Sequence, residues 1–149
     1  MRPGLLERLV ARVQQVSVES GQKVILLGWS LGGIYAREVA KLAPDSVQLV
    51  VTLFSPFSGN PRANNAWRVY ELISGQQINH LTAQFDLASK PPVQTIAVWS
   101  DRDGIVAPSC SCGLEGQSDQ QVYVPSTHFG FGRNADAIRQ VAMLMHDAK

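Results

Sequence analysis

The feature that most constrains the fold of this chain is a serine set between two glycines, after an apolar run and before a helical pattern. Gly28-Trp29-Ser30-Leu31-Gly32 matches G-x-S-x-G, a pattern in which a sharp turn joins a strand to a helix. Such a turn holds the serine in a strained backbone conformation and presents its hydroxyl above the end of the strand. Strand and helix nearly collide two residues before and two residues after Ser30, so we expect glycine at both positions to avoid a Cβ clash.

The residues on either side of the motif favour this interpretation. Val24 to Leu27 form an apolar run that is typical of a strand buried on both faces. A helical pattern follows the motif to about Ala43, and Pro44 is expected to end it. The glycine spacing of a dinucleotide-binding loop and the Gly-Lys-Ser/Thr ending of a P-loop do not occur. We therefore interpret the segment as a nucleophile elbow, the strand-to-helix turn that presents a reactive serine. The alternative is a glycine-rich turn whose serine has no catalytic role.

Composition and charge exclude several classes of function. Of the 149 residues, 45% are hydrophobic and 17% are charged, which is typical of one globular domain with a real core. A net charge of +1 gives no electrostatic basis for binding nucleic acid or an anionic membrane. No segment has the character of a signal peptide or the length of a membrane span. We therefore expect a soluble, cytoplasmic protein.

The two cysteines, Cys110 and Cys112, are one residue apart. Without a second pair of ligands they make a poor zinc site, and a disulfide between them would close a strained ring. We expect two ordinary thiols in a loop, no bound metal and no cofactor.

Apolar segments alternate with helical patterns along the chain. The predicted strands are residues 24–27, 47–54, 93–99 and 120–124, and the predicted helices are residues 4–20, about 31–43 and a last helix that Asn134 caps. In this last helix the predicted core stripe is Ile138, Val141, Ala142 and Met145. The alternation favours a single α/β domain over residues 1–149, with a mainly parallel open sheet of about four strands flanked by helices. A less regular insert occupies residues 58–90.

A serine nucleophile needs a base, and the base works better when a carboxylate orients it. Asp103 follows the third predicted strand, and the apolar sequence after it is able to pack the turn down. Asp101 is the rival acid, although we expect it to cap the turn instead. His128 follows the fourth strand in a loop that leaves its ring room to reach Ser30. For His80 in the insert and His146 near the chain end, we expect solvated or helix-capping roles.

These motifs, in this order, resemble those of α/β-hydrolases, in particular bacterial esterases and lipases. The matching segments are Gly28-Trp29-Ser30-Leu31-Gly32-Gly33, Phe54-Ser55-Pro56-Phe57, Asp103-Gly104-Ile105-Val106 and His128-Phe129-Gly130. The resemblance implies that Ser30 is the nucleophile, His128 the general base and then acid, and Asp103 the residue that orients it. It also implies that the backbone amide of Leu31 is one oxyanion donor. The expected activity is hydrolysis of a small-molecule carboxylic ester through an acyl-enzyme.

Members of that family usually carry several strands before the elbow strand, and an upstream loop supplies the second oxyanion amide. Here a single predicted helix precedes it, so the chain resembles the C-terminal part of the fold. The strand at residues 24–27 would then lie at the edge of the sheet, although its sequence is that of a central strand. One alternative is therefore a catalytically impaired fragment or pseudo-hydrolase that self-associates through this exposed edge. A thioesterase or acyltransferase would use the same three residues.

The insert at 58–90 stands where the family commonly places a cap over the site. If it is a cap, an apolar substrate pocket is expected, lined by Trp29, Phe57, Trp67 and Tyr70. A packed crossover helix with no contact to substrate is the alternative interpretation.

Overall fold

The computed structural model describes residues 4–59 and 85–147. Trp67, Tyr70, His80 and most of the predicted cap lie outside these residues. In chain order the described elements are α1 (Leu5–Ser20), β1 (Val24–Trp29), α2 (Leu31–Leu42), the 3₁₀ turn η1 (Pro44–Ser46), β2 (Val47–Leu53), β3 (Gln94–Trp99), α5 (Pro108–Ser111), β4 (Gln120–Tyr123), the 3₁₀ turn η3 (Phe131–Arg133) and α6 (Ala135–Asp147).

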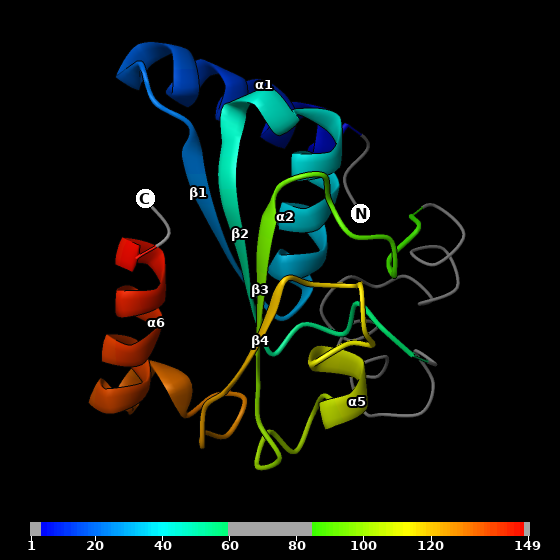
Figure 1. Ribbon diagram of the computed structural model, residues 1–149, viewed down its shortest axis with the longest axis vertical. Coiled ribbons are helices and arrows are strands. Elements are labelled where there is room, and N and C mark those ends of the chain that lie inside the picture. The colour runs from blue at the N-terminus through cyan, green and yellow to red at the C-terminus, as the bar shows by residue number, and fades with distance from the viewer. Residues whose placement is uncertain (1–3, 60–84, 148–149) are drawn as a thin grey trace.

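The four described strands form one parallel sheet in the order β1-β2-β3-β4. Helix α2 packs against β1 and β2, and α1 packs outside α2, whereas α6 covers the other side of the sheet (Figure 1). This arrangement confirms the predicted α/β class and the parallel sheet. Because the strands are parallel, their carboxyl ends all lie at the same edge of the sheet.

The core consists of two apolar layers that share strand β2. Its odd-numbered residues from Leu49 to Leu53 pack on the side of α6, together with Ala137 and Val141 of that helix. Val47 and Val50 belong to the layer beneath α2, with Ala36 and Ala40. Burial on both faces explains why β2 is an almost unbroken apolar run.

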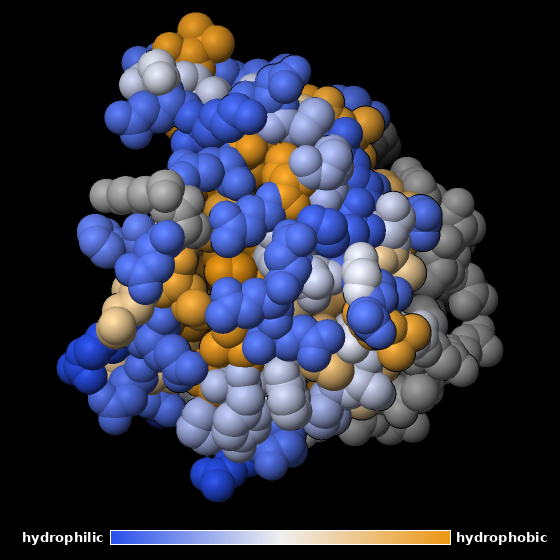
Figure 2. Space-filling model, viewed as in Figure 1, coloured by the Kyte–Doolittle hydropathy of each residue, from blue (hydrophilic) through white to orange (hydrophobic). Residues whose placement is uncertain are grey.

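Strand β1 departs from the prediction that it is buried on both faces. Val24, Ile25 and Leu26 are only partly buried, and Leu27 is 48% exposed. The reason is its place at the edge of the described sheet, which is where the lack of predicted strands before it placed it. Leu27 is in register with Val51 and therefore faces the side of α6, but α6 lies over the other strands. Apolar surface is consequently exposed between α1 and α6 (Figure 2).

The predicted core stripe of α6 is partly wrong. Val141 is 2% exposed as expected and Met145 packs against the core, but Ile138 is 44% exposed and Ala142 is exposed as well. Ala137 replaces Ile138 in the core. Neighbouring residues of a helix point about 100° apart, so Ala137 and Ile138 cannot both face the core equally. The spacing of apolar residues in the sequence does not determine which of the two does.

The predicted helix ends agree with the structure. Gly21 adopts the left-handed conformation at φ 66°, and its N–H donates to the Val18 carbonyl at the end of α1. At the start of α6, the Asn134 side-chain oxygen accepts the Ala137 N–H at 3.1 Å.

Cys110 and Cys112 are thiols and not the two halves of a disulfide, as predicted. Cys110 is buried within the short helix α5, so the expected place in a loop is wrong for this residue, whereas Cys112 directly follows the helix and does lie in a loop. Burial raises the pKa of the Cys112 thiol. In the part of the chain that the structure describes, no helix has both the length and the apolar character needed to span a membrane.

Candidate active site

The turn at Ser30 has the strained backbone that the motif predicts. Ser30 adopts φ 53° and ψ −123°, a region that side-chain-bearing residues rarely occupy. Its N–H donates to the Leu53 carbonyl at 2.8 Å, which ties the turn to the end of β2. Helix α2 starts at the next residue, Leu31, so the serine lies between the end of β1 and the first turn of the helix.

Two glycines, Gly28 and Gly33, allow the close approach of strand and helix at this turn, whereas the prediction named Gly28 and Gly32. A Cβ at Gly28 would overlap the backbone of Gly33, in agreement with the expected close approach of strand and helix. A Cβ at Gly32 would meet nothing within 4 Å, so the prediction of a clash there is wrong. The second crowded position is Gly33, where a Cβ would overlap the Ser55 side chain. The helix turns Gly32 outward and brings the next residue against the end of β2.

Asp103 follows β3 at the same edge of the sheet and is held there by hydrogen bonds. Its carboxylate is almost completely buried, and one oxygen accepts the backbone N–H groups of Ile105 at 2.8 Å and Val106 at 2.6 Å. The other oxygen lies 2.7 Å from Nδ1 of His128. The apolar segment after Asp103 therefore fixes the turn as predicted, because the backbone amides of Ile105 and Val106 hold the carboxylate in place.

The rival acid, Asp101, has a different partner. It is exposed and accepts a hydrogen bond from the Tyr123 hydroxyl at 2.7 Å, which raises the pKa of Tyr123. The turn is capped by Ser100 instead, whose hydroxyl oxygen accepts the N–H of Arg102 at 3.0 Å. Of the two carboxylates, the structure brings Asp103 to His128.

His128 is 2% exposed and is held through its backbone as well as its ring. Its N–H donates to the Asp103 carbonyl at 3.1 Å, and its carbonyl accepts the indole N–H of Trp29 at 3.2 Å. The imidazole is in contact with three aromatic rings, with the Trp29 and Phe129 centroids each at 5.2 Å and the Phe54 centroid at 6.2 Å. His146, by contrast, is exposed in the last turn of α6.

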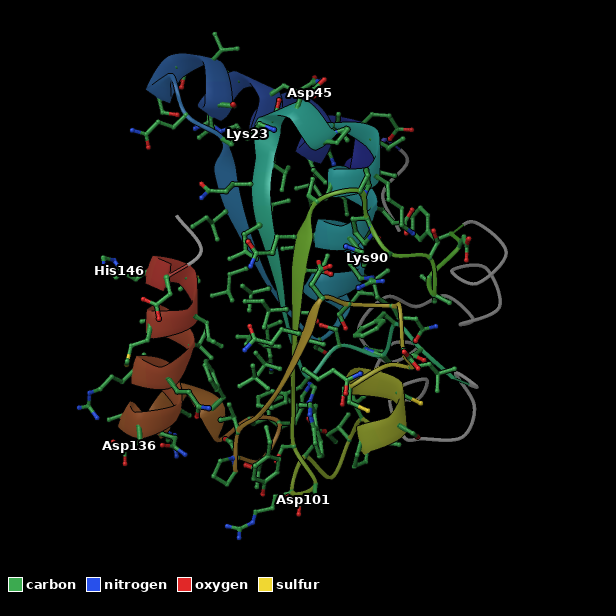
Figure 3. The ribbon with its side chains drawn as sticks, in the orientation of Figure 1. Lys23, Asp45, Lys90, Asp101, Asp136 and His146 are labelled. Atoms are coloured by element: carbon green, nitrogen blue, oxygen red, sulfur yellow. The ribbon has the colours of Figure 1, made fainter. Side chains whose placement is uncertain are left out.

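The turn at Ser30 follows β1, Asp103 follows β3 and His128 follows β4, so all three lie at the carboxyl edge of the sheet. Asp101 marks this end of the molecule in Figure 3, far from Lys23 and Asp45, which precede β1 and β2. Within residues 4–59 and 85–147, no three His, Cys, Asp or Glu side chains are grouped so that they would hold a metal ion.

Of the residues predicted to line a substrate pocket, Trp29 and Phe57 belong to the described part of the chain, and they differ in exposure. Trp29 is 45% exposed beside His128. Phe57 is 1% exposed, and the guanidinium carbon of Arg37 lies 4.2 Å from its ring centroid, so this ring is engaged in packing.

Arg37 itself was not anticipated from the sequence. It is 1% exposed, and its guanidinium donates to the carbonyls of Ser89 at 3.1 Å and Gln117 at 2.9 Å. Burial lowers the pKa of Arg37 to about 10, although neighbouring Glu38 raises it. An arginine in an amphipathic helix usually lies in solvent, so no local signal distinguished this one.

A parallel sheet with a strained serine turn at its carboxyl edge is the architecture of the α/β-hydrolase superfamily, to which this chain belongs. More narrowly, the family model of the PGAP1-like alpha/beta domain matches residues 4–123, and the chain is a member of that family.

Curated relatives match part of the chain. A pimeloyl-[acyl-carrier protein] methyl ester esterase of Aliivibrio fischeri (strain ATCC 700601 / ES114) is 35% identical over 78 residues, which are 50% of this chain and 29% of that protein. The protein of the same name from Klebsiella pneumoniae (strain 342) is 43% identical over 47 residues, 32% of this chain and 18% of that protein. The chain thus spans less than a third of the length of these relatives.

Solved structures share the fold at low sequence identity. MGS-MChE2, an α/β-hydrolase enzyme from a sediment metagenome of the Mar Chica lagoon, has a TM-score of 0.64 at 20% identity, covering 95% of this chain and 69% of that one. The esterase domain of a Rhodothermus marinus protein has a TM-score of 0.66 at 19% identity, covering 97% and 67%.

Proposed function

We propose that this chain is a serine hydrolase that cleaves carboxylic esters, with Ser30 as nucleophile, His128 as general base and Asp103 as the residue that orients the imidazole. The observation that supports this proposal most is the buried 2.7 Å contact between Asp103 and His128, at the sheet edge that also carries the strained serine turn. A buried carboxylate beside Nδ1 favours the tautomer with the proton on that nitrogen. The other ring nitrogen, Nε2, is then the proton acceptor.

In the proposed reaction, Nε2 of His128 takes the proton of the Ser30 hydroxyl as the serine oxygen attacks the ester carbonyl. The same proton passes to the alcohol that leaves, and an acyl-enzyme remains on Ser30. Water then attacks this acyl group and gives a proton to Nε2 of His128. The bond between the acyl carbon and the serine oxygen breaks, the imidazolium returns the proton to that oxygen, and the acid is released. Asp103 stabilises the imidazolium that forms in both steps without taking its proton.

The negative charge that develops on the carbonyl oxygen needs hydrogen-bond donors. The N–H of Leu31 belongs to the first turn of α2, where backbone amides have no partner within the helix. The positive end of the helix dipole favours an anion at the same place. We propose this amide as one donor of the oxyanion hole.

For the substrate, we propose a small-molecule ester with an apolar acyl group, bound beside Trp29 and beneath a cap formed by residues 58–90. Trp67 and Tyr70 of the cap, together with Phe57, remain proposed pocket residues. The curated relatives named as methyl ester esterases support an ester as substrate.

A fluorophosphonate probe, which reacts with activated serines, tests the nucleophile. We expect the folded wild-type chain to be labelled and Ser30→Ala to be unlabelled. Ser109→Ala, at an exposed serine in α5, is the matched control and keeps full labelling. Folded protein that takes no label would contradict an enzymatic role for this chain.

The acid is tested by comparing two aspartates that lie two residues apart. Asp103→Asn removes the carboxylate beside His128, and we expect it to lower kcat for p-nitrophenyl butyrate by about 10³-fold or more. Asp101→Asn removes the exposed partner of Tyr123 and should change kcat less than about threefold. Equal losses in the two variants would argue against Asp103 as the orienting residue.

A second candidate is a catalytically impaired chain that acts by self-association, and the exposed apolar edge strand β1 favours it. Absence of fluorophosphonate labelling combined with a stable oligomer would favour this candidate over the hydrolase. A thioesterase or an acyltransferase would be labelled as well, and a comparison of ester and thioester substrates separates those activities from ester hydrolysis.

A further inference from the structure

Trp29 joins the serine turn directly to the loop that carries His128. The indole N–H of Trp29 donates to the backbone carbonyl of His128 at 3.2 Å, across 99 residues of sequence. On the other side of the same residue, the His128 N–H donates to the Asp103 carbonyl at 3.1 Å. The backbone N–H of His128 is therefore bonded to Asp103, and its backbone carbonyl is bonded to Trp29, the residue before Ser30.

Ring packing reinforces this link. The Trp29 ring centroid lies 5.2 Å from the His128 imidazole, and the two planes are inclined by 37°. Phe129 packs edge-on against both rings, at 5.7 Å from Trp29 and 5.2 Å from His128. Phe129 is 65% exposed, Trp29 is 45% exposed and His128 only 2%, so the two aromatic rings lie between the imidazole and solvent.

We propose that Trp29 is a positioning residue for His128. Because Trp29 is covalently next to Ser30, the hydrogen bond to the His128 carbonyl makes the elbow and the histidine loop one rigid unit. The inference rests on the proposed hydrolase function, and it differs from a role of Trp29 in substrate binding alone. A positioning role acts on kcat, whereas loss of a substrate contact raises KM.

The kinetic test uses Trp29→Phe, which keeps an aromatic ring at the site and removes the N–H donor. From the net free energy that a typical hydrogen bond contributes in proteins, we expect kcat for p-nitrophenyl butyrate to fall roughly 2- to 12-fold while KM stays unchanged. The matched control is Trp99→Phe in β3. The Trp99 ring packs on the ring of Tyr123, with 5.1 Å between their centroids, and neither residue belongs to the proposed triad. It should keep the wild-type kcat.

A second readout does not depend on activity. Hydrogen exchange of the His128 amide, measured by NMR, reports the bond to Asp103. We expect Trp29→Phe to accelerate this exchange at least roughly twofold, while the Val124 amide, bonded to the Trp99 carbonyl at 2.9 Å, is unchanged. If the wild-type chain proves inactive, the proposed function fails, and exchange at His128 alone decides whether Trp29 positions this residue.

A third variant covers the case in which Trp29→Phe disturbs folding. Replacing Trp29 by β-(3-benzothienyl)alanine exchanges the indole N–H for sulfur and keeps the shape of the ring. We expect the same loss in kcat and the same faster exchange at His128. Wild-type kcat and exchange in this variant would overturn the proposal. So would a raised KM at unchanged kcat, because that result assigns Trp29 to substrate binding.

Discussion

The backbone at Ser30 is held in an unfavourable conformation by its neighbours. A non-glycine residue at φ 53° costs on the order of 1–3 kcal/mol and persists only where the surrounding structure enforces it. The bond from the Ser30 N–H to the Leu53 carbonyl provides one constraint, and the contact of Gly28 with Gly33 provides another. Phe54, directly after Leu53, has φ 51°, so the ends of β1 and β2 are strained side by side.

The two glycines of the motif should respond differently to alanine. Gly28→Ala places a Cβ against the backbone of Gly33, which cannot move without separating strand from helix, so we expect a loss of about 3 kcal/mol or more in unfolding free energy. Gly32→Ala meets open space in the first turn of α2 and should leave stability unchanged or raise it by up to about 1 kcal/mol. Urea unfolding of both variants gives the comparison, and equal losses would contradict the assigned geometry.

The strand ends opposite the candidate site are joined by a polar cluster. Asp119, just before β4, accepts the Thr95 N–H and the Lys90 ammonium, each at 2.8 Å. The cluster aligns the start of β4 with β3 and helps to set the register that pairs Ile96 with Gln120. Partial burial raises the pKa of Asp119, but the hydrogen bonds from Lys90 and Thr95 outweigh it and hold that pKa below its ordinary value of 3.8.

This pKa shift predicts a pH dependence. A carboxylate with a lowered folded-state pKa stabilises the fold fully above pH 3.8, its pKa in the unfolded chain, and loses that effect as pH falls through its folded-state pKa. We expect Asp119→Asn to lower the unfolding free energy at pH 7 by no more than about 1 kcal/mol, because the side chain is 43% exposed.

The difference between the wild-type chain and Asp119→Asn should shrink towards zero below pH 3.8. Urea unfolding from pH 7 downwards measures it. Asp136→Asn serves as the control, because its partner Arg139 and its own carboxylate are both largely exposed on α6. A difference that grows on acidification would contradict the assigned shift.

At the scale of the whole molecule, the sheet is covered unevenly. Helices α1 and α2 lie on one side, while on the other side α6 packs against the other strands and leaves part of β1 open (Figures 1 and 2). Leu27 shows this incomplete cover most clearly, because it is an apolar strand residue that is 48% exposed. An apolar edge strand without an internal charge is a surface on which a further strand is able to pair.

We therefore predict that the isolated chain self-associates through β1. Leu27→Lys places a charge on the exposed edge and should shift the molecular mass measured by light scattering towards the monomer across a concentration series. Leu42→Lys is the matched control, because Leu42 is 59% exposed at the end of α2 and does not belong to the sheet. A wild-type chain that stays monomeric at every concentration would refute the prediction.

The sequence was most informative where the structure depends on neighbours along the chain. The serine turn, the glycine cap of α1 and the Asn134 cap of α6 follow from local backbone preferences, and all three agree with the structure. The parallel class follows from the alternation of apolar and helical segments. The order of serine, acid and histidine along the chain also limited the candidate residues to very few.

Contacts between distant segments decided the rest. Whether β1 is buried, which face α6 presents and which glycine is crowded all depend on what lies across from them, and apolar spacing contains no such information. The burial of Arg37 depends on carbonyls 52 and 80 residues away in sequence. At the candidate site, the sequence by itself predicted the strained serine turn and favoured Asp103 over Asp101 as the partner of His128. Only the tertiary structure contains the 2.7 Å contact between them, because a hydrogen bond is made by geometry in space and not by distance along the chain.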